Sequence, residues 1–373
     1  MTTKLRAASF QDGAVTTAKI AADAITNAKM ADDAIHSVNI AAGAVDSDAI
    51  GSSAIPVNKL NIGQIGGRRN IIINGAMEIN QRSATSGVTS GYFVDRFRLS
   101  GCSASAVITS NTPTAFPTAI TVSATSGNPI VTQRIESKAV KHLSGKTVTA
   151  SFFAKNVSNA TTLYTSLQYA GSADNFGSST TITEHNLGSL TSDWVQYTAS
   201  WTVPAGGLNG LALNILCAGS STFTMGVTGV QLEVGSQATE FEHRSFGEEL
   251  ALCQRYYYKS MDGSPADNIP NTDNTSSNGT SGIAMYSATS GRTQYFQHPV
   301  QMRADPTVTV YSSQRANTSG RWGLFNHSAW VATATSSPTV DVGRITFSIT
   351  HGSSLTAGYT YLLAGGFDAD AEI

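Results

Sequence analysis

The sequence is poor in charge. Asp, Glu, Lys and Arg make up 13% of its 373 residues, about half the usual share for a globular protein. The net charge of −2 does not indicate a large basic surface of the kind that binds nucleic acid. The apolar content of 40% is enough for hydrophobic cores, and Gly is abundant, with 34 residues. This composition favours a β-rich structural or extracellular surface over a charge-dense cytosolic enzyme.

Cysteine is also scarce. Cys102, Cys217 and Cys253 are too far apart in sequence for a disulfide framework or a zinc site, and we expect buried thiols. No run of about 18 apolar residues indicates a transmembrane helix. The first residues contain no apolar segment typical of a signal peptide, so we expect synthesis in a cytoplasm.

Motifs for catalysis are missing as well. The sequence contains no Gly-rich phosphate loop, nucleophile elbow or His-Glu-x-x-His helix, and its seven His residues are scattered. A glycosidase needs two carboxylates about 5–10 Å apart. Glu136, Glu184 and Asp193 remain open as members of such a pair, but no pattern selects them. We expect no catalytic residue, no enzyme activity and no cofactor.

Residues 1–66 contain a repeat. Ten-residue units begin at Ala14 with AVTTAKIAAD, and a large apolar residue recurs every five positions from Leu5 to Ile65. A period of five makes no continuous stripe on a helix and alternates between the two faces of a strand. Apolar residues this sparse can be buried where three chains meet around an axis, so we predict a kinked, trimeric shaft. A disordered linker is the alternative.

Residues 67–244 show a different pattern. Short β runs alternate with Gly/Ser/Thr/Asn turns, which is typical of a β-sandwich or jelly roll. Period-two alternation predicts that Val195, Tyr197, Ala199, Trp201 and Val203 share one face.

The rest of the chain predicts a helix and a second β domain. Ser245 and Glu248 have the spacing of a capping box, which predicts a linking helix over 245–260. Residues 261–280 indicate a long loop within a C-terminal β domain, 261–373. We expect strands there at 283–288, 293–302, 307–311, 344–349 and 359–367. The predicted class is therefore mainly β: a fibrous repeat, a central β-sandwich, a short helix and a distal β domain.

Several motifs resemble one family. RRNIIINGAMEINQR (68–82) and GYFVDRF (91–97) resemble the start of a domain common in bacteriophage tail fibres. GVQLEVG (229–235), ATEFE (238–242) and SFGEELALCQRYY (245–257) resemble its close. The preceding repeat resembles fibre-shaft repeats, and FQHPVQMRADPTVTVY (296–311) resembles a segment of fibre-tip domains. The resemblance implies a virion tail protein whose distal domain faces away from the particle.

The central domain is also similar to carbohydrate-binding jelly rolls. Those domains often hold a structural calcium through a Glu in the first strand and an Asp before the last strand. Glu78 matches the first position, but no Asp is present near Thr228. The resemblance therefore leaves a calcium site without one of its ligands.

Aromatic residues that could stack on sugar rings are the candidate binding residues. The segment RWGLFNHSAW (321–330) brings together Trp322, Phe325, His327 and Trp330, and as an exposed loop it would be the best receptor contact. In a hairpin, one of its Trp residues would be core. Trp194 and Tyr92 are further candidates, for which packing is the alternative.

These observations predict a trimeric tail fibre that attaches a phage to bacterial surface glycans. Two alternatives remain: a glycan-degrading tail spike and a purely structural tail or baseplate connector. The expected partners are two further copies of the chain, other tail or baseplate proteins through the N-terminal segment, and host polysaccharide. We expect neither nucleic-acid binding nor membrane insertion.

Overall fold

The computed structural model describes residues 68–82 and 90–373, apart from 261–279, 286, 288, 313–322, 326–329, 333–334 and 351–354, together with positions 16, 20 and 40. The chain divides between Leu60 and Asn61 into two units, and the described helices and strands all belong to the second unit. Almost all of the predicted shaft, 1–66, lies outside the described residues.

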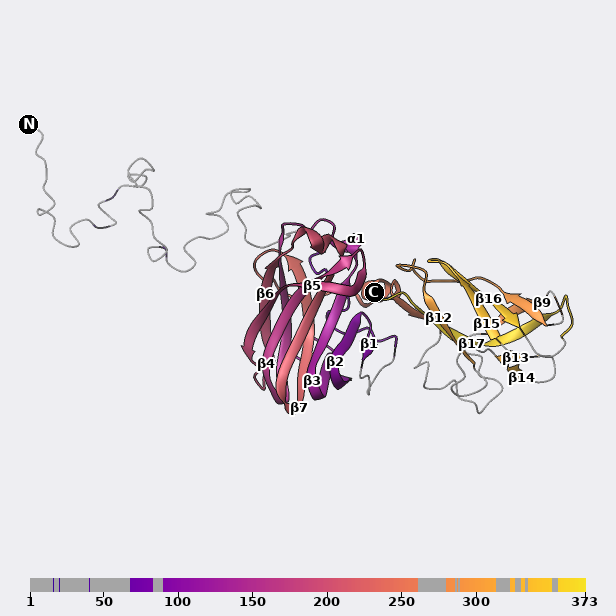
Figure 1. Ribbon diagram of the computed structural model, residues 1–373, viewed down its shortest axis with the longest axis horizontal. Coiled ribbons are helices and arrows are strands. Elements are labelled where there is room, and N and C mark those ends of the chain that lie inside the picture. The colour runs from indigo at the N-terminus through magenta and orange to yellow at the C-terminus, as the bar shows by residue number, and fades with distance from the viewer. Residues whose placement is uncertain are drawn as a thin grey trace, which may run out of the picture. The chain divides into compact units, whose positions relative to one another are not determined.

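The central domain is one antiparallel sheet of seven strands in the order β1-β2-β3-β7-β4-β5, with β6 also paired to β4. Its strands are β1 (Gly91–Val94), β2 (Phe97–Thr109), β3 (Ala119–Ile135), β4 (Thr147–Ser172), β5 (Asn175–Ser189), β6 (Val195–Thr202) and β7 (Leu211–Val234). A short helix, α1 (Ser137–Val140), precedes β4, and a 3-10 helix, η6 (Ala205–Asn209), precedes β7. Figure 1 shows the long strands β3, β4 and β7 side by side.

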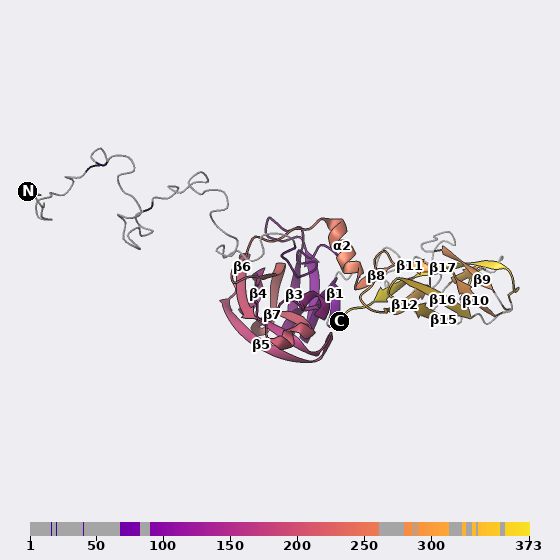
Figure 2. The same cartoon turned by 90° about the horizontal axis from the view of Figure 1, so that it is seen from above.

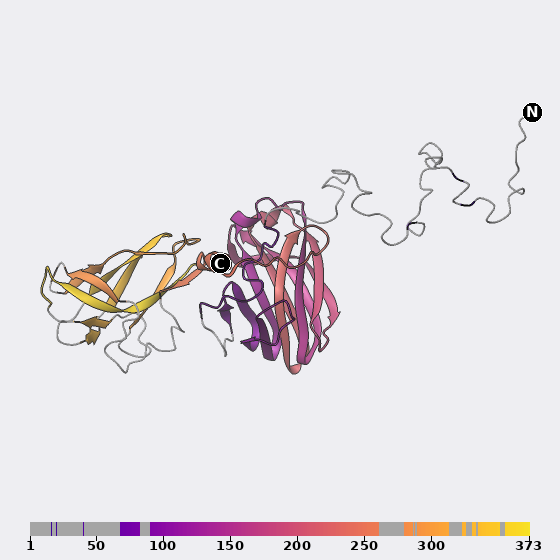
Figure 3. The same cartoon turned by 180° about the vertical axis from the view of Figure 1, so that it is seen from behind.

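The long strands bend, and the two halves of a bent strand can pair with different neighbours. Residues 147–154 of β4 pair with β6, whereas residues 162–172 pair with β5. The register of β4 against β7 shifts four times, and β3 against β7 shifts once. Such bulges bend a strand and increase its twist. Figure 2, seen from above, shows the strands curving around a common interior, and Figure 3 shows the long strands from behind.

The interior holds the core that the alternation predicted. Ala199, Trp201 and Val203 are buried, while Val195 at the start of β6 is exposed. The rest of this core includes Ile72, Met77, Phe93, Phe97, Leu99, Val131, Phe152, Leu167, Leu213, Ile215, Val230 and Leu232. The mainly β class with a curled sandwich is therefore confirmed.

Strand β7 is buried on both sides at its end, which alternation alone does not predict. Gln231 and Glu233 point away from the core yet are buried. The Glu233 carboxylate accepts hydrogen bonds from the main-chain N–H and hydroxyl of Thr239 at 2.8 and 2.7 Å, and Gln231 accepts one from the Glu242 N–H at 2.9 Å. The segment after β7 therefore folds back over its polar face.

The linking helix is shorter than predicted. Helix α2 spans Phe246–Gln254, and β8 (Tyr257–Lys259) follows and pairs with the last strand. The expected extension to residue 260 is wrong because the run of Tyr residues pairs in a sheet, where aromatic residues are favoured. The expected capping box is also absent: the Ser245 side chain makes no capping hydrogen bond, and Glu248 instead forms an ion pair with Arg68.

The distal strands form a second antiparallel sheet. They are β9 (Thr280–Met285), β10 (Ser290–Thr293), β11 (Phe296–Gln297), β12 (Thr307–Ser312), β13 (Gly323–Phe325), β14 (Trp330–Ala332), β15 (Thr335–Val340), β16 (Arg344–Thr350) and β17 (Thr360–Asp370). Strand β17 pairs with four other strands of this sheet, β8, β9, β12 and β13. Phe347 and Phe367 pack in its core with ring centroids 5.4 Å apart.

The predicted strand at 293–302 is interrupted. Only β10 and β11 form within its range, and the chain then leaves the ladder at His298 and Pro299. Proline has no N–H for a sheet. The N–H groups of His298 and Met302 donate instead to the carbonyls of Gly343 and Val342, at 3.0 and 2.7 Å.

Two further expectations concern the thiols and the membrane. Cys217 and Cys253 are buried free thiols, as predicted, while the side chain of Cys102 lies outside the described residues. Within the described part of the chain, no helix has the length and apolar character to span a membrane.

Candidate functional site

A polar groove crosses the outer face of the central sheet, opposite the core. Cross-strand pairing places six residues in one row across β1, β2, β3, β7, β4 and β5: Tyr92, Arg98, Thr132, Asn214, Ser166 and Glu184. Directly paired residues of antiparallel strands share a face. A cavity of about 130 Å³ lies at the middle of this row, where Arg98, Thr132 and Asn214 line it together with Ser100, Ile130, Arg134, Gln168, Phe176, Ser179 and Ala212.

The floor of the groove is a fixed hydrogen-bond chain. The Thr132 hydroxyl donates to Asn214 Oδ1 at 2.8 Å, and Asn214 Nδ2 donates to the Ser166 hydroxyl at 3.2 Å. All three side chains are buried. A side-chain amide has two N–H donors and two acceptor lone pairs, so these bonds leave Asn214 with hydrogen-bonding capacity. The floor is thus rigid and polar.

The walls carry longer polar side chains. Gln168 Oε1 accepts a hydrogen bond from the Ser179 hydroxyl, and Gln168 Nε2 donates to the Thr181 hydroxyl, both at 3.2 Å. The Arg134 guanidinium lies 5.0 Å from the centroid of the Phe176 ring, within the range of a cation–π contact. Hydroxyl, amide, guanidinium and aromatic groups therefore meet in one groove.

Arg134 and Arg98 differ in their contacts. Arg134 Nη1 donates to the main-chain oxygen of Ile373 at 2.6 Å. Burial lowers the pKa of Arg134, and the positive charge of Arg98 lowers it further, against the opposing effects of Tyr92 and Glu372. Arg98 is half-buried, and none of the described residues gives it a hydrogen bond or an ion pair.

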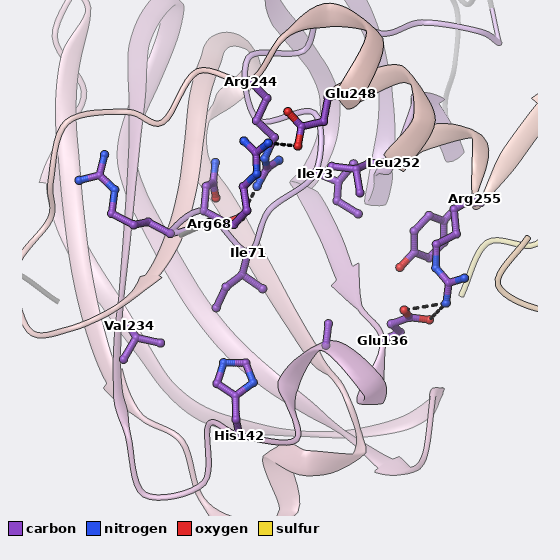
Figure 4. Close-up of a pocket in the computed structure, with 14 residues that line it drawn as sticks. Arg68, Ile71, Ile73, Glu136, His142, Val234, Arg244, Glu248, Leu252 and Arg255 are labelled. Carbon is purple, nitrogen blue, oxygen red and sulfur yellow. Dashed lines mark hydrogen bonds and ion pairs between the residues drawn. The ribbon is translucent and has the colours of Figure 1, made fainter. Parts of the chain in front are cut away.

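A second, larger hollow has a different character. Its volume is about 360 Å³, and it lies between the segment 68–73, α1 and α2. Figure 4 shows Ile71 and Ile73 between charged groups that pair with one another. Arg255 Nη2 donates to both oxygens of Glu136 at 2.9 and 3.1 Å, and Arg244 and Arg68 pair with Glu249 and Glu248. These ion pairs brace the helices against the sheet.

The segments that carry the tail-fibre resemblance form a buried framework. Asn74 Nδ2 donates to the carbonyls of Ile79 and Asp95, at 2.8 and 3.0 Å, and Asn74 Oδ1 accepts from the Ile79 N–H at 2.9 Å. The Asp95 carboxylate accepts two hydrogen bonds from Gln81, at 3.1 and 2.6 Å. Burial raises the pKa of Asp95 to about 6, although the bonds from Gln81 and the charge of Arg82 act in the opposite direction.

The same framework holds the end of β17. Arg96 is completely buried, forms an ion pair with Glu372 and lies 3.5 Å from the centroid of the Tyr256 ring. Arg82 pairs with Asp370 at 3.0 Å. These contacts hold the end of β17 against the central domain.

Trp194 and Tyr92, two of the predicted site residues, make internal contacts. A Cβ built on Gly226 would lie 2.8 Å from Cη2 of the Trp194 indole, so the ring packs closely against β7 at Gly226. The Lys155 ammonium lies 5.2 Å from its centroid. The Tyr92 hydroxyl donates to the main-chain oxygen of Ile373 at 2.9 Å. Tyr92 nevertheless lies at the end of the groove row, beside Arg98.

The other four predicted site residues belong to the distal domain. Phe325 is half-buried at the end of β13, and its backbone pairs with Trp330 of β14. Trp322 and His327, and the side chain of Trp330, lie outside the described residues. The hairpin alternative is thus the one observed for the backbone at Phe325 and Trp330.

The structure also places the three carboxylates that were considered for a catalytic pair. Glu136 pairs with Arg255 in the second hollow, Glu184 lies at the β5 end of the groove row, and Asp193 lies in the loop before β6. The second calcium ligand of carbohydrate-binding jelly rolls would fall near Thr228 in this sequence. In the structure the Thr228 hydroxyl donates to the Thr118 carbonyl at 2.8 Å. In the described ranges, no three His, Cys, Asp or Glu residues gather closely enough to hold a metal ion.

Sequence reasoning missed the groove residues Arg134, Gln168, Phe176 and Asn214. Arg134, Gln168 and Asn214 alternate with core residues along their strands, which was a usable signal, whereas Phe176 lies on β5, where no described residue belongs to the buried core. The alternation of side chains along a strand assigns each residue to one face of the sheet. It does not say which strands are neighbours.

No family model matches the chain, and no curated protein matches its sequence. Among solved structures, the enzymatically active domain of tailspike protein 4 from bacteriophage CBA120 is similar, with 17% identity and a TM-score of 0.32, over 44% of this chain and 21% of the tailspike chain. The module TmCBM61, solved with β-1,4-galactotriose, has 13% identity and a TM-score of 0.30, over 45% of this chain and 99% of the module.

The xylan-binding CBM22-1 domain of Paenibacillus barcinonensis Xyn10C has 12% identity and a TM-score of 0.32, over 46% of this chain and 100% of the domain. The chain thus spans about a fifth of the tailspike chain and the full length, or nearly so, of these two modules. Slightly less than half of the chain is similar to a phage tailspike domain and to carbohydrate-binding modules.

Proposed function

We propose that this chain is a phage tail-fibre protein that attaches the virion to bacterial surface glycans, and that the groove on the central sheet binds the glycan. The observation that carries the proposal is the groove whose lining brings Thr132 and Asn214 together with Gln168 and Phe176. Sugars are recognised by hydrogen-bonding groups around the hydroxyls together with an aromatic face. The groove supplies both on a rigid sheet.

The tail-fibre part of the proposal rests on the order of the motifs. The repeat, the segments 68–82 and 91–97 and the closing segments 229–257 occur in the order expected of a fibre. In this proposal the N-terminal segment assembles the trimer and joins other tail or baseplate proteins. Three copies of a weak sugar site then give useful avidity, provided that the glycan repeats can reach them together.

The proposal is for binding without cleavage. Purified full-length protein should bind cells from a panel of bacterial strains with no release of reducing sugar from their polysaccharide. Reducing sugar that accumulates in proportion to protein concentration would support the glycan-degrading alternative.

The groove is tested by substitution. Removing the wall contacts with Gln168→Ala and Phe176→Ala should weaken cell binding about tenfold or more, because an aromatic contact and a hydrogen bond are each worth about 1 kcal/mol. Thr180→Ala, an exposed position on β5 that does not line the groove, is the matched control. If Trp322→Ala with Trp330→Ala abolishes binding and the groove variants do not, the receptor site lies in the distal domain.

A further inference from the structure

The charged side chains that line the groove are all positive. Its lining contains two guanidinium groups, Arg98 and Arg134, and no carboxylate. Neutral sugar sites pair hydroxyls with acceptors as well as donors, and carboxylates often supply the acceptors. Here the charged groups of the lining are all donors, since a guanidinium has no acceptor.

No acid among the described residues pairs with Arg98, although the charge of Glu372 acts to raise the pKa of Arg134. Glu372 forms its ion pair with the buried Arg96. Glu184 belongs to the same row but lies on β5, four strand spacings from β2, which is about 19 Å. Arg134 has its contacts with Ile373 and Phe176, while the described residues leave Arg98 without a partner.

An unpaired, half-buried guanidinium disfavours a neutral ligand. A neutral sugar that covers Arg98 would remove water from the charge and return only neutral hydrogen bonds, which costs free energy. An anionic group would return charge-assisted bonds, which are shorter and about twice as strong. Guanidinium groups bind planar carboxylates and phosphates in a bidentate manner.

We propose that the groove selects acidic glycans and that Arg98 holds the anionic group of the repeat unit. This inference rests on the proposed function and specifies its ligand class. The anion is a sugar carboxylate or a phosphate substituent, and both present the oxygens that Arg98 needs. Arg134, fixed by Phe176 and Ile373, adds a second positive charge to the same groove.

The test uses full-length protein on an array of bacterial surface polysaccharides that contains both neutral and acidic repeats. Each acidic polymer is also printed in a carboxyl-reduced form and in a dephosphorylated form. We expect binding to acidic polymers only. Loss on carboxyl reduction identifies a uronic-type acid, and loss on dephosphorylation identifies a phosphate. Binding should also weaken as salt is raised, because salt screens exposed charges.

Substitution of Arg98 supplies the second readout. Arg98→Gln should weaken binding to an acidic polymer about tenfold, as expected for one charge-assisted bond, and should remove most of the salt dependence. Arg98→Lys should retain part of the affinity. Arg292→Gln, which removes the same charge from an exposed position on β10, should bind like the unsubstituted protein, and thermal unfolding should show that all three variants remain folded.

The outcomes separate the two proposals. Binding to neutral polymers that Arg98→Gln leaves unchanged overturns the acidic selectivity and leaves glycan binding in place. An array without any bound polymer, neutral or acidic, contradicts the proposed function and the inference with it.

Discussion

At the scale of single residues, the most specific sequence motifs serve the framework. Asn74 adopts a positive φ of 60° and uses its side chain to hold two carbonyls and an N–H. Asn tolerates this left-handed conformation better than most residues. Asp95 and Arg96 are both buried beside it. The residues of these motifs therefore hold one another through internal hydrogen bonds.

Asp95 gives a prediction about pH. Its folded pKa of about 6 lies above the ordinary value of 3.8, so the folded state binds the proton more tightly than the unfolded state. The carboxylate therefore destabilises the fold above pH 6, and the penalty is relieved as the pH falls from about 6 to 4. Two pKa units correspond to about 3 kcal/mol.

The measurement compares urea unfolding of the unsubstituted protein and Asp95→Asn between pH 7 and pH 4. The variant cannot titrate at this position. The other carboxylates contribute equally to the pH dependence of both proteins, so their contributions cancel when the two free energies of unfolding are subtracted. The free energy of unfolding of the unsubstituted protein should rise relative to the variant by about 2 kcal/mol as the pH is lowered from 7 to 4. A difference that stays constant over this range would show that burial does not perturb Asp95.

At the scale of elements, the central domain depends on the close approach of the segment 68–82 to β7. The Val230 N–H donates to the Gly75 carbonyl at 2.9 Å. A Cβ on Gly75 would lie 2.1 Å from the Val230 carbonyl oxygen. Because that oxygen also accepts a hydrogen bond from Asn70 Nδ2 at 3.3 Å and belongs to a strand that pairs with β4 at the next residue, it cannot move away cheaply.

Two glycine substitutions test this packing. Gly75→Ala should lower the free energy of unfolding by about 3 kcal/mol, since the added methyl group overpacks a fixed backbone. Gly247→Ala in α2, where an added Cβ meets nothing within 4 Å, should instead raise it by up to about 1 kcal/mol through helix propensity. Chemical denaturation measures both, and equal effects of the two substitutions would contradict the close approach.

At the scale of the whole molecule, the question is how many chains assemble. The apolar ladder of residues 5–65 has one large apolar residue in every five, too few to be buried against the same chain. Ile20 and Ile40, the two ladder residues among the described positions, are 42% and 45% exposed in the single chain. Contact with other copies would remove such surface from water, which is the main favourable term in association.

We therefore predict a homotrimer in solution. Light scattering on the full-length protein should give about three times the chain mass of 39.0 kDa. Substitution of Ile25, Ile35 and Ile40 by Asp should lower the mass while residues 70–373 keep their thermal transition, because like charges near a shared axis repel. A monomer of the unsubstituted protein at micromolar concentration would rule out the shared core.

The sequence alone determined the class of the fold and much of its local structure. Alternation along 195–203 predicted the buried face of β6, including Trp201, because a strand's two faces follow directly from its period of two. The helix near residue 246 was also predicted, although its end was not. The backbone pairing of β8 with β17 decided where α2 ends, and that pairing joins residues more than a hundred positions apart.

Only the tertiary structure decided where the candidate site lies. Arg98, Thr132, Asn214 and Ser166 come from β2, β3, β7 and β4, and the sequence order of these strands differs from their order in the sheet. Strand β7 inserts between β3 and β4, and this insertion brings Asn214 between Thr132 and Ser166. Side-chain period is a local property and can be read from neighbouring residues, whereas strand order results from packing the whole chain around one core. The groove therefore became visible only in the folded molecule.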